Sequence, residues 1–145
     1  MKTETKYKKC CLCIISKNKK YLLQLRDNIK NIKDPNTWGL FGGHLKKNEN
    51  IKQCIKRELK EELDLNIKKI IFLFKIFYLK DKRECYIFFT KIKNQKLKLL
   101  EGKGFEFFTI KKIIKGFLNL KNRRHNVTYI TKKVFKRFKM NINSI

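Results

Sequence analysis

The segment 43–65 constrains this chain more than any other, because it gathers acidic residues along one predicted helix. Five of the chain's 12 acidic residues fall within residues 49–64, although the formal net charge of the whole chain is +26. Residues 50–63 contain no Gly or Pro and therefore predict a helix. We expect Asn48 and Glu49 to supply its N-terminal cap.

One face of this predicted helix changes from apolar to acidic along its length. At about 100° per residue, Ile51, Cys54 and Ile55 share a stripe that we expect to face the protein interior. One turn later the stripe continues into three carboxylates, those of Glu58, Glu61 and Glu62. Like charges at these spacings repel, and partial burial raises their pKa values. A divalent cation would remove that cost, and Mg²⁺ or Mn²⁺ prefers carboxylate oxygens.

The alternative interpretation is an acidic patch on a solvated helix, and the neighbouring residues favour the metal site over it. Arg57 lies one turn before Glu61, where an ion pair can hold the carboxylates in place. Gly42 and Gly43 end the apolar run 38–41, and glycine allows the backbone to come close to a ligand or metal.

The pattern Gly-x5-Glu-x7-Arg-Glu-Leu-x-Glu-Glu-x-Asp-Leu begins at Gly43 and resembles the Nudix box, the signature of Nudix hydrolases, at eight of its nine defined positions. The departure is Asp64, where the family usually has Gly just past the helix end. Asp tolerates a left-handed backbone better than most residues, so we expect a modest loss of stability and an intact site. The resemblance implies an α/β/α sandwich with a mixed β-sheet.

The resemblance also implies a reaction and assigns roles to residues. Nudix hydrolases use Mg²⁺ or Mn²⁺ to cleave nucleoside diphosphates linked to another group, by attack of water on phosphorus. The catalytic and metal-binding carboxylates would be Glu58, Glu61 and Glu62, with Glu62 essential. Gly43 would offer its backbone carbonyl to the metal, and Arg57 and Glu49 would orient the carboxylates.

Family members often recruit a further acidic residue from outside the box, as a metal ligand or as a base. The segment 100–109 is similar to the late loop and strand of nucleotide-sanitising members, which makes Glu101 the first candidate and Glu106 the second. An equal alternative is a glycine-rich loop whose carboxylates are incidental.

Length and charge limit the remaining interpretations. A chain of 145 residues without a linker or repeat predicts one domain, 1–145. Lysines occur in every segment, and Lys, Asn, Ile and Phe are abundant, as AT-rich codons would produce. We therefore attribute more of the basic charge to genome composition than to selection for polyanion binding. A positive field would still attract nucleotide polyphosphates.

The five cysteines do not indicate a zinc site. Cys10 and Cys13 are spaced Cys-x-x-Cys, but no second pair or nearby His completes a ligand set. We interpret Cys11 and Cys13 as small apolar residues of a strand. An odd cysteine count without a secretory signal predicts a reducing, cytoplasmic location. The apolar stretch 70–79 is too short for a membrane span, so we expect no membrane partner.

The apolar pattern predicts strands and helices around the box. We expect strands at 10–16, 21–26, 69–80 and 84–92, shorter strands at 97–100 and 105–108, and helices at 110–114 and 127–138. Residues 123–125 predict an exposed basic turn. The last helix could instead contact RNA or a membrane surface, since lysines separate its apolar residues.

The leading functional interpretation is a MutT-like Nudix pyrophosphohydrolase that cleaves a nucleoside triphosphate or a related nucleoside diphosphate derivative, with oxidised nucleotides as candidate substrates. An RNA 5′-end pyrophosphohydrolase is the alternative enzyme, because the high basic charge suits RNA. A non-catalytic Nudix-like module that binds nucleotides or RNA is the third interpretation, although three clustered carboxylates argue against it. The box leaves the base, the leaving group and the oligomeric state open.

Overall fold

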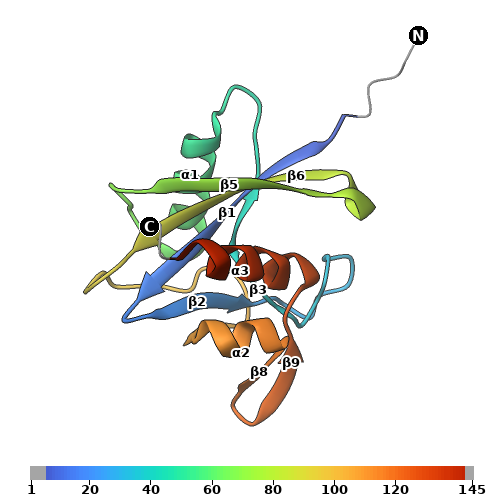
Figure 1. Ribbon diagram of the computed structural model, residues 1–145, viewed down its shortest axis with the longest axis vertical. Helices are drawn as coiled ribbons and strands as arrows, with labels where there is room; N and C mark the ends of the chain where they lie inside the picture. The colour runs from blue at the N-terminus through green and yellow to red at the C-terminus, as the bar shows by residue number, and fades with distance from the viewer. Residues whose placement is uncertain (1–5, 143–145) are drawn as a thin grey trace.

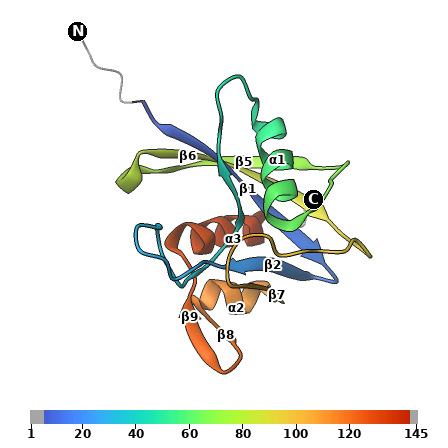
Figure 2. The same ribbon diagram turned by 180° about the vertical axis from the view of Figure 1, so that it is seen from behind.

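The computed structural model describes residues 6–142 as a β-sheet with helices packed on both faces (Figure 1). Helix α1 (Ile51–Leu63) covers one face, and α3 (Tyr129–Asn141) lies on the other, together with the short α2 (Ile110–Lys115). Figure 2 shows the same layers from behind, with α1 in front of the sheet. The strands are β1 (Lys8–Lys17), β2 (Lys20–Leu25), β3 (Trp38–Gly39), β4 (Phe41–His44), β5 (Ile71–Tyr78), β6 (Arg83–Lys91), β7 (Gly104–Phe108), β8 (Phe117–Leu120) and β9 (Arg123–Asn126).

The main sheet is mixed, as the sequence predicted. Its order is β3-β2-β1-β6-β5, with β4 paired to β1 and β7 paired to β2. The β1–β6 pair is parallel, and the other pairs of this sheet are antiparallel. Strand β1 therefore lies in the middle of the molecule and meets three other strands. The prediction of an α/β/α sandwich is confirmed.

Alternate residues of β1 enter two separate cores, because successive side chains of a strand point to opposite faces. Cys10 and Ile14 belong to the core under α3, whereas Cys11, Cys13 and Ile15 belong to the core under α1. A strand buried on both faces reads as a continuous apolar run, which explains the sequence of this segment.

Two segments differ from the prediction. Residues 97–100 form an irregular loop instead of a strand, because their N–H groups find partners at the end of α1: those of Lys98 and Leu100 donate to the carbonyls of Leu63 and Glu62. Residues 123–125 belong to β9 instead of a turn, and pair with β8 in a separate two-stranded sheet. Within β9, the guanidinium of Arg124 stacks 3.5 Å from the ring centroid of Phe117.

The N-cap of helix α1 lies one residue after the predicted pair, Asn48 and Glu49. Asn50 is the N-cap: its side chain accepts a hydrogen bond from the N–H of Gln53, whose side chain accepts one from the N–H of Asn50. This reciprocal capping box satisfies two N–H groups that the helix leaves free. At the other end Asp64 adopts φ +52°, the left-handed conformation that the sequence predicted.

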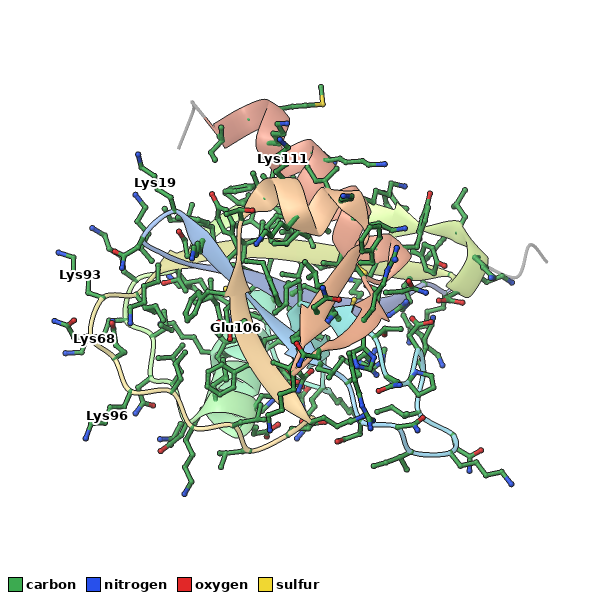
Figure 3. The ribbon with its side chains drawn as sticks, turned by 90° about the horizontal axis from the view of Figure 1, so that it is seen from below. Lys19, Lys68, Lys93, Lys96, Glu106 and Lys111 are labelled. Atoms are coloured by element: carbon green, nitrogen blue, oxygen red, sulfur yellow. The ribbon has the colours of Figure 1, made fainter. Side chains whose placement is uncertain are left out.

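Within residues 6–142, no helix is long and apolar enough to cross a membrane. All five cysteines are buried and free of disulfides. Figure 3 shows labelled lysines on separate elements, from the β1–β2 turn (Lys19) to the loop after β6 (Lys93) and α2 (Lys111). The basic charge is thus spread over the surface, as predicted. The cytoplasmic location and the single domain stay predictions.

Candidate functional site

The site begins where β4 runs against α1, and two glycines allow this approach. Gly42 has φ +145°, and a Cβ on it would lie 1.9 Å from the carbonyl oxygen of Cys11 in the neighbouring strand. A Cβ on Gly43 would lie 2.3 Å from Oε1 of Glu58. Glycine is thus required at Gly42, where the Cβ would meet backbone, whereas a Cβ on Gly43 would displace the Glu58 carboxylate from its place against the β4 backbone.

Glu62 is a buried acid at the centre of this contact. Its side chain projects from α1, the residue is 5% exposed, and the N–H of Gly42 donates to its Oε2 at 3.0 Å. Burial raises the pKa of Glu62 to about 9, and the negative charges of Glu58 and Glu101 add to the shift. The Gly42 N–H and the charge of Arg26 oppose it. Burial and like charges both favour the protonated acid when no cation is bound.

The loop after β6 brings Glu101 to the same place. The N–H of Leu100 donates to the carbonyl of Glu62 at 2.9 Å, and Gln24 Nε2 donates to the carbonyl of Glu101 at 2.8 Å. Glu101 itself is exposed and lines the cleft described below. Glu106, the second candidate, lies on β7 with its carboxylate accepting from the N–H of Phe107, outside the cleft lining (Figure 3).

Arg57 connects the carboxylates around the site. Its guanidinium donates to Glu49 at 2.7 and 3.0 Å, to Glu58 at 2.8 Å and to Glu61 at 3.1 Å. It also donates to the carbonyl of His44 at 3.1 Å, which ties α1 to β4. The guanidinium lowers the pKa of Glu49 to about 2. The predicted ion pair between Arg57 and Glu61 is confirmed.

The prediction that Glu61 shares the inward face of α1 is wrong. Its side chain is 51% exposed and binds Arg57, with Lys46 4.0 Å away. The buried face of α1 also contains Leu59 and Leu63, and this places its centre away from Glu61. At about 100° per residue, Glu61 then falls at the edge of the buried face.

A divalent cation fits the chemistry of these residues. A buried carboxylate beside two others and a glycine backbone offer the hard oxygen donors that Mg²⁺ and Mn²⁺ prefer. The cation would also offset the repulsion that favours protonation of Glu62. Among residues 6–142, no three His, Cys, Asp or Glu side chains already converge as a complete ligand set. The donors that lie together are Glu58 and Glu62, and Glu101 lines the same cleft.

Glu58, Glu62 and Glu101 line a cleft of about 440 Å³. Its cationic side chains are Arg26, Lys33, Lys46 and Arg83, and its apolar ones include Leu12, Ile32, Leu40 and Ile130. The sequence did not single out Arg26 or Arg83, because nothing local distinguishes them among 38 basic residues. Volume and composition suit a small anionic ligand with an apolar or aromatic part.

The fold is a mixed sheet between helices. One helix, α1, places glutamates against the glycine backbone of β4 at the edge of a cleft. These features together define a class of α/β proteins. The NUDIX domain model matches residues 6–130, and the chain therefore belongs to the Nudix family.

Individual relatives agree with this assignment. The 8-oxo-dGTP diphosphatase of Buchnera aphidicola subsp. Schizaphis graminum is 40% identical over 75 residues, which are 52% of this chain and 55% of that protein. The match thus spans about half of the curated relative. The MutT protein of Methanosarcina mazei has a similar fold, with a TM-score of 0.78, 20% identity, and coverage of 96% of this chain and 97% of that one. The MutT NUDIX hydrolase of Burkholderia pseudomallei aligns with a TM-score of 0.73 and 17% identity over 90% and 97% of the two chains.

Proposed function

We propose that this protein is a divalent-metal-dependent nucleotide pyrophosphohydrolase, with nucleoside triphosphates of the oxidised kind as substrates. The observation that carries the proposal is the buried Glu62, held beside Glu58 and Glu101 against the backbone of β4. A structural role alone gives no reason to bury a carboxylate next to two others. The similarity to an 8-oxo-dGTP diphosphatase supports the substrate class.

The chain's own residues suit three tasks in this reaction. Glu58 and Glu62, with the carbonyl of Gly43, would hold Mg²⁺ or Mn²⁺, which supplies charge neutralisation for the phosphate oxygens and lowers the pKa of water. Arg57 fixes Glu58 and the start of α1 through its hydrogen bonds to Glu49. Glu101, exposed in the lining of the same cleft, can accept the proton of the attacking water. Water then bonds to phosphorus, and the bridging P–O bond breaks.

Glu61 has a different position in this proposal. Its exposed carboxylate would join the cation only after leaving Arg57, by a change of rotamer at the edge of α1. We therefore assign the first contacts with the cation to Glu58 and Glu62.

The remainder of the cleft suits a nucleotide. Its cations favour a polyphosphate: Arg26 and Lys46 line it, as do Lys33 and Arg83, which also pair with Asp81. Apolar side chains such as Leu12 and Ile130 offer contact area for a base. Polar and apolar groups in one cleft thus match the two halves of a nucleotide.

The test is hydrolysis with Mg²⁺ and Mn²⁺ across a panel of nucleoside triphosphates, oxidised nucleotides, nucleotide sugars and dinucleoside polyphosphates. Glu62→Gln removes the charge with little change of shape, and Glu106→Gln removes an exposed carboxylate outside the cleft as a matched control. We expect metal-dependent turnover that is lost in Glu62→Gln and retained in Glu106→Gln. Equal rates in all three proteins, or none in any, would overturn the catalytic proposal and favour a binding module.

RNA with a 5′-triphosphate is the second candidate substrate, because the net charge of +26 suits a long polyanion. Adding such RNA to the same panel separates the two candidates. Cleavage of the RNA with an affinity that falls steeply with salt would favour it. Cleavage confined to free nucleotides would exclude it.

A further inference from the structure

Two cysteines from different strands touch beside the cleft, and one of them, Cys10, is part of its lining. Sγ of Cys10 in β1 lies 2.8 Å from Sγ of Cys85 in β6, and the two residues are register partners of the parallel pair. We propose that Cys10 and Cys85 are an oxidisable dithiol, a modification site that closes to an intramolecular disulfide when a peroxide enters the cleft. The proposal does not depend on the hydrolytic activity.

The backbone is already placed for this bond. Neighbouring strands lie roughly 4.8 Å apart, and the Cα atoms of disulfide-linked residues are usually about 4.4–6.8 Å apart. Cys10 and Cys85 both point into the core under α3, so their sulfurs face each other. A disulfide of about 2.0 Å requires the two sulfurs to approach by roughly a further 0.8 Å. Rotation of the side chains supplies such a movement without a change of strand register.

The cleft gives a small oxidant access to the pair. Cys10 is 3% exposed and lines the cleft beside Leu12 and Arg83. Cys85 is fully buried behind Cys10 and is reached only through it. The three other cysteines, Cys11, Cys13 and Cys54, are fully buried on the opposite face of the sheet. In the described part of the chain, none of these three lines the cleft. A peroxide that enters the cleft therefore reaches Cys10 before any other thiol.

The electrostatic surroundings favour a thiolate at this pair. The hydrogen bond between the two sulfurs, in which either can be the donor, lowers the pKa of the Cys85 thiol; burial opposes this, and the positive charges of Arg83 and Lys33 add to it. The same hydrogen bond and burial raise the pKa of Cys10, so the two thiols hold one proton between them when the pair is ionised. A cysteine beside cations with a thiol partner is the usual setting of a redox-active pair.

The chemistry balances with the peroxide as oxidant. The thiolate attacks one peroxide oxygen, the O–O bond breaks, and hydroxide leaves, giving a sulfenic acid. The second thiol then attacks that sulfur and loses its proton, and the hydroxyl group departs as water. Overall two thiols and one hydrogen peroxide give one disulfide and two waters, and a dithiol reductant reverses the change.

A second pair of cysteines, Cys11 and Cys54, allows the access argument to be tested. Cys11 and Cys54 are both fully buried in the core under α1, close to the box. Sγ of Cys11 also donates to the carbonyl of Ile51 at 3.4 Å, and Sγ of Cys54 contacts the carbonyl of His44 at 3.6 Å. Proximity alone would allow either pair to oxidise, whereas access through the cleft selects Cys10 and Cys85.

The experiment treats the full, folded chain in EDTA with a small excess of hydrogen peroxide. Catalase then removes the oxidant, and iodoacetamide alkylates the free thiols after unfolding. We expect an intact mass with three of the five cysteines alkylated, a Cys10–Cys85 linked peptide, and full alkylation after dithiothreitol. Five alkylated cysteines, a Cys11–Cys54 link, or sulfinic acids without a crosslink would each overturn the proposal. The wild-type peptide map gives this result without any variant.

Variants then test the chemistry. Cys10→Ser and Cys85→Ser should each abolish the crosslink, and Cys85→Ser should leave a sulfenic acid on Cys10, the thiol that lines the cleft, which dimedone traps. Cys13→Ser is the matched control, because Cys13 lies buried in the same strand and, among the described residues, its Sγ hydrogen-bonds only to the carbonyl of Ile14, at 3.6 Å. It should retain the crosslink. Loss of the crosslink in Cys13→Ser, with retention in Cys10→Ser, would contradict the assignment.

Discussion

Replacing Glu62 with Gln should remove most of the pH dependence of stability in the metal-free protein. The folded protein keeps the Glu62 carboxyl protonated to a pKa of about 9, whereas the unfolded chain releases this proton near the ordinary value of 4.5. Between these two values the unfolded state binds fewer protons, so the free energy of unfolding falls as pH rises. Gln keeps the shape and can still accept the hydrogen bond from the N–H of Gly42.

The expected size is large for a small protein. Each pH unit inside that window removes about 1.4 kcal/mol, so wild type should lose about 3 kcal/mol relative to Glu62→Gln between pH 5.5 and 7.5. The total stability of a domain is typically only about 5–15 kcal/mol. The variant should therefore be clearly more stable than wild type at pH 7.5, and the two should converge near pH 4.5.

Urea unfolding in EDTA measures this difference, with fluorescence of the single, fully buried Trp38 as the signal. Glu61→Gln is the matched control, since that carboxylate is half exposed at the edge of the same helix and should leave the wild-type slope unchanged. Saturating Mg²⁺ should stabilise wild type most at high pH and Glu62→Gln much less. Parallel pH curves for wild type and Glu62→Gln would refute the argument.

Three further predictions concern the residues around this acid. Gly42→Ala should lower the free energy of unfolding by roughly 3 kcal/mol or more, because its Cβ would collide with the Cys11 carbonyl; a loss under about 1 kcal/mol in urea melts would contradict the close packing. Arg57→Gln should lower the free energy of unfolding by about 1–3 kcal/mol, because charged hydrogen bonds are lost. It should also raise the Mg²⁺ concentration needed for half-maximal activity, and an unchanged metal requirement would exclude the orienting role of Arg57. Glu101→Gln should lower kcat about a hundredfold in steady-state assays while Glu106→Gln leaves it unchanged, and equal kcat values would show that neither is the base.

The box helix could be predicted because its signals are local. The position of Asp64 past the helix end and the four-residue spacing of Arg57 and Glu61 depend only on helix geometry, and the structure confirms both. The mixed sheet was predicted through the family resemblance, with strands placed by their apolar runs. Local rules also explain the errors: Asn48, Glu49 and Asn50 are all acceptable caps, and the side chain of Gln53 selects Asn50.

Contacts between segments that are distant in the sequence could not be predicted from the sequence. Glu61 sits at the spacing of a buried residue, yet the packing of Leu59 and Leu63 turns it outward. Glu101 lies far along the chain from Glu62, and only the loop 97–100, bound to the end of α1, brings the two acids together.

The sequence by itself determined the helix, its cap chemistry, the glycines of β4 and the set of acids available for a metal, because these depend on residue type and short spacing. Only the tertiary structure decided which acid is buried, which second acid joins it, and which two of five cysteines meet. Burial and electrostatic coupling depend on the through-space distance between β1, β6 and α1, and that distance is set by the packing of the whole sheet.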